Sequence, residues 1–258
     1  MSTPALSALT TLEVTEAPDR LVVRLNRPDV RNAINQTMVD ELHAVCEYLE
    51  NTPKVLILMG TSTEKGAVFA SGADIAELRE RRREDALKGI NANLFVRIAA
   101  LPLPVIAAMD GWVLGGGAEL AYAADFRIGT DRIKIGNPET SLGILAAAGA
   151  SWRLKELVGE PLAKDILLAG RVLNAEESLA CHLVTSVHAP EDLEAAAQEL
   201  ADRITAQAPL ALAATKRAFA APREEHPAID GREQAELFES EEKFARMDAF
   251  LARRKAKK

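Results

Sequence analysis

Short apolar runs rich in β-branched residues recur through the first half of the chain, and most stop at a turn that contains glycine, proline or asparagine. Such runs are typical of buried strands. We expect strands at 21–25, 55–59, 67–70, 104–109, 126–129 and 133–136, and helices at 37–49, 74–83 and 118–124. The repeating order of strand, strand and helix predicts an α/β fold that is wound from similar layers.

The second half of the chain is rich in alanine, leucine, glutamate and lysine, which favour helices. Helices are expected at 147–158, 161–168, 175–181, 190–207, 210–220 and 234–254. With 258 residues, of which 48% are hydrophobic, the chain can bury a sizeable core. We therefore expect an α/β core over residues 1–173 and a helical region over residues 174–258.

Composition and charge exclude several classes of protein. The formal net charge is -7, and an acidic balance argues against nucleic-acid and anionic-membrane partners, which attract basic patches. The longest apolar stretches are interrupted well short of a membrane span. Residues 1–11 lack the pattern of a secretory signal or transit peptide. Two distant cysteines fit a reducing cytosol, so a cytoplasmic protein is expected, and four scattered histidines predict no metal site.

Three segments contain residues that could carry chemistry: Phe69–Ile75, Asp110–Leu120 and Ile135–Glu139. Taken singly, each has an ordinary explanation. The first is a connection from strand to helix, the second is a glycine-rich turn before a helix, and the third ends in a loop glutamate. The second matches neither the dinucleotide-binding pattern nor the P-loop pattern.

Taken together, the three segments favour a catalytic site. The small-residue turns at 71–74 and 115–117 expose backbone N–H groups, and two such sources could hold one developing oxyanion. Glu119 and Glu139 could do paired acid and base work beside it.

These segments resemble those of the enoyl-CoA hydratase/isomerase (crotonase) family. The resemblance extends over nearly the whole chain, through Leu25-Asn26-Arg27-Pro28, Leu103–Ala108, Gly170-Arg171 and the C-terminal Ala249–Arg254. It implies a spiral of strand-strand-helix units with an acyl-CoA site in residues 1–173. The helical region 174–258 would then serve oligomerisation and cover the CoA site. The implied partners are an acyl-CoA substrate and identical subunits in a homotrimer or dimer of trimers, with no metal or other cofactor.

The resemblance also implies roles for individual residues. The N–H groups of Ala73 and Gly116 would form an oxyanion hole for the thioester carbonyl, and Glu119 and Glu139 would be the acid/base pair. The residues implied to bind substrate are Arg31, Ala33, Ala73, Asp74, Ile75 and Gly116, with Arg31 expected to contact a CoA phosphate. Because family isomerases typically keep only the acid at the position of Glu139, the pair favours syn addition of water to a 2-enoyl-CoA.

Other functions stay open on the sequence alone. Double-bond isomerisation and hydrolysis of a CoA thioester use the same framework, and a non-catalytic acyl-CoA-binding or RNA-binding relative is a further alternative. The acidic balance argues against RNA, and the intact glutamate pair argues against an inactive relative.

Two departures from the family pattern carry expectations of their own. Ala146, Ala147, Ala148 and Ala150 stand where the family's hydratases favour proline and glycine. Either their methyl groups narrow the acyl pocket near C3 and C4, or they point into the core and change nothing. His182 replaces a helix-ending glycine, and we expect it to adopt a left-handed backbone and serve a structural role.

Overall fold

The computed structural model describes residues 6, 9–61 and 66–256. The expectation that residues 1–11 carry no targeting signal falls partly on residues 1–5, 7 and 8, which lie outside the described residues. The chain divides into two compact units, Met1–Ala201 and Asp202–Lys258. The functional division expected at residue 173 stays a prediction. No described helix is long and apolar enough to cross a membrane.

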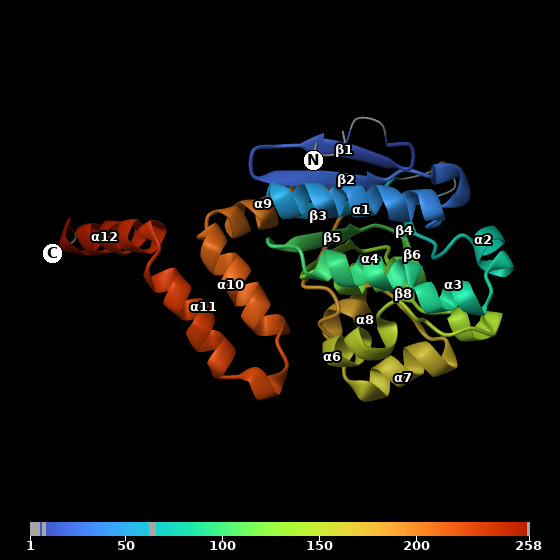
Figure 1. The fold of residues 1–258 in the computed structure, drawn as a ribbon. Helices are drawn as coiled ribbons and strands as arrows, with labels where there is room; N and C mark the ends of the chain where they lie inside the picture. The colour runs from blue at the N-terminus through green and yellow to red at the C-terminus, as the bar shows by residue number, and fades with distance from the viewer. Residues whose placement is uncertain (1–5, 7–8, 62–65, 257–258) are drawn as a thin grey trace. The chain divides into compact units, whose positions relative to one another are not determined.

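The first unit contains a six-stranded sheet in the order β1-β2-β3-β5-β7-β10. Strand β1 pairs antiparallel with β2, and every other neighbouring pair is parallel. The strands are β1 (Leu12–Glu16), β2 (Arg20–Leu25), β3 (Val55–Gly60), β5 (Val105–Met109), β7 (Phe126–Thr130) and β10 (Ser186–His188) (Figure 1).

A second sheet has four strands in the order β4-β6-β8-β9, which are β4 (Val68–Ala70), β6 (Trp112–Leu114), β8 (Lys134–Gly136) and β9 (Val172–Leu173). Strands β3, β5 and β7 each lie in the large sheet, and the strand that follows each of them lies in the small sheet. The chain therefore passes between the two sheets once per turn, which confirms the expected α/β spiral of strand-strand-helix units.

Helices separate the turns of this spiral. Those of the first unit are α1 (Gln36–Asn51), α2 (Ile75–Glu80), α3 (Arg83–Lys88), α4 (Ile90–Ala99), α5 (Gly116–Ala123), α6 (Lys155–Val158), α7 (Glu160–Ala169), α8 (Ala175–Ala180) and most of α9 (Leu193–Thr205). The second unit contains the end of α9 with α10 (Pro209–Ala220), α11 (Ala228–Phe238) and α12 (Glu241–Ala256).

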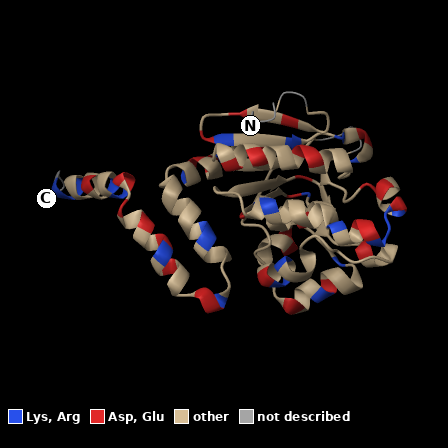
Figure 2. Cartoon of the chain, viewed as in Figure 1, with Lys and Arg blue, Asp and Glu red and all other residues tan. Residues whose placement is uncertain are grey.

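Helix α1 follows directly from its sequence pattern. Asn35 caps its N-terminus by accepting a hydrogen bond from the backbone N–H of Met38 at 3.0 Å. Its buried residues recur at helical spacing, and they are Met38, Val39, Leu42, Val45, Cys46 and Leu49. Helices α1 and α4 pack against each other, and α4 also packs against α5 (Figure 1). The charged residues of α1 are all acidic, which gives the red segments along this helix in Figure 2, and they are Asp40, Glu41, Glu47 and Glu50.

Two expected helices are each interrupted in the structure. The helix expected at 74–83 stops at Glu80, and α3 begins at Arg83 after extended backbone at Arg81 and Arg82. The helix expected at 234–254 is two helices, α11 and α12, that are separated at residues 239–240. His182 has φ 59°, which confirms the expected left-handed backbone.

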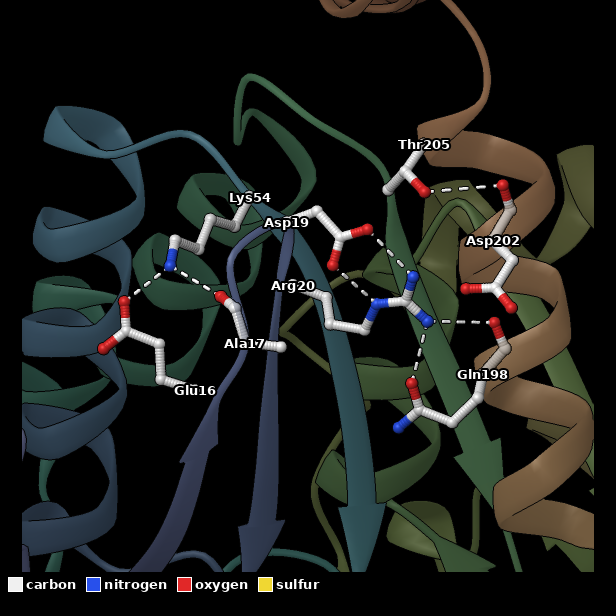
Figure 3. A network of polar contacts seen from close by, with 8 residues as sticks. All are labelled: Glu16, Ala17, Asp19, Arg20, Lys54, Gln198, Asp202 and Thr205. Atoms are coloured by element: carbon white, nitrogen blue, oxygen red, sulfur yellow. Dashed lines mark hydrogen bonds and ion pairs between the residues drawn. The ribbon is translucent and has the colours of Figure 1, made fainter.

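A polar network fastens helix α9 to the start of β2 (Figure 3). The guanidinium of Arg20 is almost fully buried and donates to both carboxylate oxygens of Asp19 at 2.9 Å. It also donates to the side-chain oxygen of Gln198 at 2.8 Å and to its backbone carbonyl at 3.1 Å. These charge-assisted bonds join segments 178 residues apart in sequence.

The side chain of Asn32 joins three segments of the first unit. It is fully buried, and its backbone is left-handed with φ 54°. Its Oδ1 accepts from the backbone N–H of Arg27 at 3.0 Å and from the hydroxyl of Thr61 at 3.1 Å. Its Nδ2 lies 3.0 Å from the carbonyl oxygen of Val68 and 3.2 Å from that of Phe69. One amide thus holds the loop after β2 against β4.

Asn32→Ala should lower the free energy of unfolding by about 3 kcal/mol, because it strands buried polar partners and places a Cβ-bearing residue without local hydrogen bonding in left-handed backbone. Urea denaturation measures this change. The control is Asn51→Ala, which removes one exposed amide that contacts Glu47 and should change stability by less than about 0.5 kcal/mol. Equal effects of the two substitutions would contradict a central role for Asn32.

Candidate active site

The candidate site lies at one edge of the small sheet. Strands β4, β6 and β8 are parallel neighbours, so their carboxyl ends meet at the same edge. Ala73 follows β4, Gly116 follows β6 and Glu139 follows β8, each within three residues of the strand end. Three successive turns of the spiral therefore deliver the predicted site residues to one place, where open α/β sheets commonly bind ligands.

The turn after β4 presents the N–H of Ala73. This turn pairs with the loop before α1: the N–H of Ile34 donates to the carbonyl of Gly72 at 2.8 Å, and the N–H of Asp74 donates to the carbonyl of Ile34 at 2.9 Å. Within the described residues, the N–H of Ala73 between these two bonds has no hydrogen-bond acceptor. Its direction is thus fixed by its neighbours while its donor stays available.

The glycine turn before α5 presents a second donor. Gly115 has φ 52° and ψ -125°, a conformation that favours glycine, and Gly116 is the first residue of the helix. No acceptor for the Gly116 N–H occurs in the part of the chain that the structure describes. A Cβ built on Gly116 would lie 3.5 Å from the backbone nitrogen of Ala73, so the two turns border the same space.

Gly117 lets the helix approach β4 closely enough for this arrangement. A Cβ built on Gly117 would lie 2.5 Å from the carbonyl oxygen of Ala70 and 2.6 Å from its Cβ. Any larger residue would push α5 away from β4, and the Gly116 N–H would move with it.

Glu119 lies on the first turn of α5 and is 3% exposed. Its Oε1 accepts hydrogen bonds from the backbone N–H groups of Ala148 at 2.7 Å and Ala150 at 3.1 Å. The pKa of Glu119 is raised from 4.5 to about 7, chiefly by burial and in smaller part by the nearby charge of Glu139, while the bonds from Ala150 and Ala148 oppose the rise. A carboxyl with this pKa can accept or release a proton near neutral pH.

Glu139 begins the short helical turn that follows β8, and its side chain is largely buried. A chain of hydrogen bonds reaches it: the hydroxyl of Tyr122 donates to Oδ1 of Asn137 at 3.0 Å, and Nδ2 of Asn137 lies 3.4 Å from Oε1 of Glu139. The other oxygen, Oε2, is buried and has no partner among the described residues. Burial raises the pKa of Glu139, which favours its protonated form.

The structure brings Ala73, Gly116, Glu119 and Glu139 together, and it places the other predicted residues around them. Arg31 is exposed, and Ala33 is buried beside the Ala73 turn. Asp74 caps α2 through the N–H of Ala76 at 3.1 Å and pairs with Arg27 at 3.1 Å. Hydrogen bonds from Arg27 and this cap hold the pKa of Asp74 below its ordinary value despite its partial burial. Ile75 is 58% exposed.

The sequence did not point to the groups that orient the two glutamates. Asn137 precedes Glu139 by two residues and Tyr122 follows Glu119 by three, and only this proximity could have drawn attention to them. The backbone N–H groups of Ala148 and Ala150 also contact Glu119, but every residue except proline has such a group, so the residue type does not indicate this role.

The alanine loop, residues 146–150, contacts Glu119 through the backbone N–H groups of Ala148 and Ala150. Ala146, Ala148 and Ala150 are buried in the core, whereas Ala147 is exposed. Gly149 has φ 142°, which a residue with a side chain rarely adopts, and it lets the flanking N–H groups converge on one carboxylate oxygen. Among the described residues, no group of three or more His, Cys, Asp or Glu side chains is arranged to hold a metal ion.

Glu119→Gln should stabilise the protein more at pH 8 than at pH 5. Folded Glu119 keeps its proton up to about pH 7, whereas the unfolded chain releases it near 4.5, so wild-type stability falls as pH rises between these values. Glutamine does not ionise, so it removes this loss of stability at high pH. Its side-chain oxygen can still accept the hydrogen bonds from the N–H groups of Ala148 and Ala150. Urea denaturation should show a pH-dependent difference on the order of 3 kcal/mol. Glu176→Gln, at an exposed site, is the control, and a difference independent of pH would contradict the raised pKa.

Comparison with known proteins gives independent information on the family. The family model described as enoyl-CoA hydratase/isomerase matches residues 20–257. The chain is 35% identical over 240 residues to a short-chain-enoyl-CoA hydratase of Clostridium acetobutylicum, covering 91% of this chain and 92% of that protein. It is 34% identical over 241 residues to a crotonyl-CoA hydratase of Syntrophomonas wolfei, with coverage of 91% and 92%.

A solved structure gives the same result at the level of the fold. The enoyl-CoA hydratase from Bacillus anthracis superimposes with a TM-score of 0.88 at 27% identity, covering 95% of this chain and 97% of that chain. The spiral topology, the match to the family model and these relatives place the chain in the enoyl-CoA hydratase/isomerase (crotonase) family.

Proposed function

We propose that this protein is an enoyl-CoA hydratase that adds water in a syn sense across the 2,3 double bond of a 2-enoyl-CoA. The observation that carries the proposal is the pairing of two buried carboxyls of raised pKa with two N–H groups at the same sheet edge that have no acceptor among the described residues. The names of the relatives, which include hydratases of short-chain enoyl-CoA and crotonyl-CoA, support the same reaction.

The two N–H groups stabilise the charge that develops during the reaction. In this proposal the thioester oxygen occupies the space that Ala73 and Gly116 border and accepts a hydrogen bond from each. As water attacks C3, negative charge moves onto this oxygen, and donors already fixed in direction stabilise it without reorganisation. A single donor of this kind is typically worth about 3–4 kcal/mol of the barrier.

The two carboxyls move the protons. The oxygen of water bonds to C3 while its proton passes to ionised Glu119, and protonated Glu139 gives its proton to C2. The substrate gains one hydrogen and one hydroxyl, and the proton on Glu119 must pass back to Glu139 before the next turnover. The pKa of about 7 suits Glu119 to exchange a proton at neutral pH, and burial also raises the pKa of Glu139 above its ordinary value. The Tyr122–Asn137 chain would hold Glu139 in position.

The CoA portion extends from the thioester toward the loop before α1 in this proposal. Arg31 is exposed and would contact a CoA phosphate, since an acidic protein needs a local cation for that purpose. Ala33 and residues 73–75 would line the path of the substrate. The side chain of Asp74 is engaged by Arg27 and the α2 cap, so its contribution would come from the backbone.

Double-bond isomerisation is the second candidate, because one relative at 33% identity, from Mycosarcoma maydis, is named an enoyl-CoA isomerase/hydratase. An isomerase needs one group that moves a proton between two carbons. The structure holds two buried carboxyls at the site, and the second favours hydration, where one group activates water and the other protonates carbon.

Glu139→Gln should lower kcat for crotonyl-CoA hydration by about 10²–10⁴-fold and leave KM nearly unchanged, because glutamine cannot supply the proton. The loss of absorbance of the conjugated thioester measures the rate. Glu176→Gln changes an exposed glutamate in the same way and should retain full activity. Near wild-type turnover by Glu139→Gln would remove this residue from the mechanism.

Gly116→Ala should cut kcat/KM by at least about 10²-fold with little loss of stability. The added methyl would meet Ala73 and Asn91 only at 3.5 Å, an ordinary contact, yet it would fill the space assigned to the thioester oxygen. Activity and urea denaturation are measured together. Gly231→Ala, where a Cβ meets nothing within 4 Å, is the control. An active and stable Gly116→Ala variant would overturn the oxyanion assignment.

A further inference from the structure

One polar side chain at the candidate site has no part in the reaction as proposed. Asn91 is the second residue of α4, the helix that packs against α5. Its Nδ2 lies 3.5 Å from the position of a Cβ on Gly116, the same distance as the backbone nitrogen of Ala73. The Asn91 amide therefore borders the space that the two proposed oxyanion donors share.

The oxygen of this amide lacks a partner. Oδ1 of Asn91 is buried and accepts no hydrogen bond from any residue that the structure describes. Buried polar atoms are nearly always satisfied in folded proteins, and an exception calls for a ligand or a bound water. The rest of the α4 face that points inward is apolar, with Leu94, Phe95 and Ile98 all buried. Asn91 is thus a polar residue beside the apolar, buried face of α4.

The chemistry of an amide oxygen defines the missing group. It accepts hydrogen bonds and cannot donate them, so its partner must carry an O–H or N–H. A simple enoyl group offers neither. A hydroxyl on the acyl chain offers one, either at C3 after hydration or at C4 of the substrate. The first amide N–H of the pantetheine arm is a donor on the other side of the sulfur, and it is common to every CoA ester.

We propose that Asn91 is a specificity-determining residue that selects acyl groups with a hydroxyl at C3 or C4, by accepting a hydrogen bond at Oδ1. This inference rests on the proposed function, because that function places the thioester carbon beside Ala73 and Gly116. A site built to bond a hydroxyl discriminates against the analogue that lacks it, since the buried polar group is then left unpaired.

The test compares substrates that differ by one hydroxyl in wild type and Asn91→Leu, which replaces the amide with an apolar group of similar size. The first pair is crotonyl-CoA and trans-4-hydroxycrotonyl-CoA, compared by kcat/KM. The second pair is butyryl-CoA and 3-hydroxybutyryl-CoA, compared by calorimetric Kd with Glu139→Gln added to both proteins, so that the hydroxyacyl ester is not dehydrated during the titration. Asn93→Leu makes the same change at an exposed position of the same helix and is the matched control. If Asn91→Leu does not fold, Asn91→Ala replaces it.

In at least one pair, the preference of wild type for the hydroxyl-bearing member should fall about 10–100-fold in Asn91→Leu. It should be unchanged in Asn93→Leu. A fall in the first pair assigns the hydroxyl to C4, and a fall in the second assigns it to C3. Unchanged ratios in both pairs would overturn the inference. Equal losses for all four esters would also overturn it, because they would assign Oδ1 to the pantetheine N–H.

The same experiment tests the hydratase function independently of the role of Asn91. Hydration of crotonyl-CoA by wild type tests that function without reference to Asn91. If wild type hydrates crotonyl-CoA and the ratios do not respond to Asn91→Leu, only the specificity inference fails. If wild type hydrates neither enoyl-CoA but the Kd ratio does respond, the hydratase function fails and the hydroxyl contact stands.

Discussion

The buried amide of Asn32 is the interaction on which the geometry of the site depends. It bonds to the loop after β2, to Thr61 at the end of β3 and to the carbonyls of β4. The residues that follow it, up to Ile34, then form the backbone bonds that fix the Ala73 turn. Without this anchor the first donor of the site would have no fixed direction, because the turn after β4 has few side chains large enough to hold it by packing.

The second constraint is the closeness of backbone to backbone between β4 and α5. Gly117 allows it, and Gly115 allows the chain to reverse before the helix. Both donors of the site are therefore main-chain groups, held by other main-chain groups from neighbouring turns of the spiral. The carboxyls differ in this respect: Glu119 is held by backbone N–H groups and Glu139 by side chains.

The sequence predicted the elements in which buried apolar residues recur regularly, and it did not predict strands that are short or mostly exposed. Apolar periodicity located β2, β3 and α1, because burial imposes it on every residue of an element. Strand β1 was missed because its exposed side chains are polar and only Leu12 is fully buried, and β6 was missed because it is three residues long within a glycine-rich segment.

The candidate site shows the same division. Ala73, Gly116 and the glutamates could be named because they match a family pattern. The structural roles of Asn32, Asn137 and Asn91 could not be inferred, since an asparagine has the same appearance in a sequence whether it joins two loops, orients a carboxylate or lacks a partner. The break between α2 and α3 was also unforeseen, because arginine has no local preference that ends a helix.

The spiral separates the parts of the protein that do chemistry from those that can change. The donors and carboxyls are fixed by short links after β4, β6 and β8, whereas the long excursion from β4 to β5 carries α2, α3 and α4 and returns to a strand of the other sheet. With the function proposed above, substitutions in that excursion, Asn91 among them, would alter which acyl chain is accepted while the two glutamates stay in place. A lineage with this architecture could then diversify its substrates by changing this one excursion, with the reaction itself inherited intact.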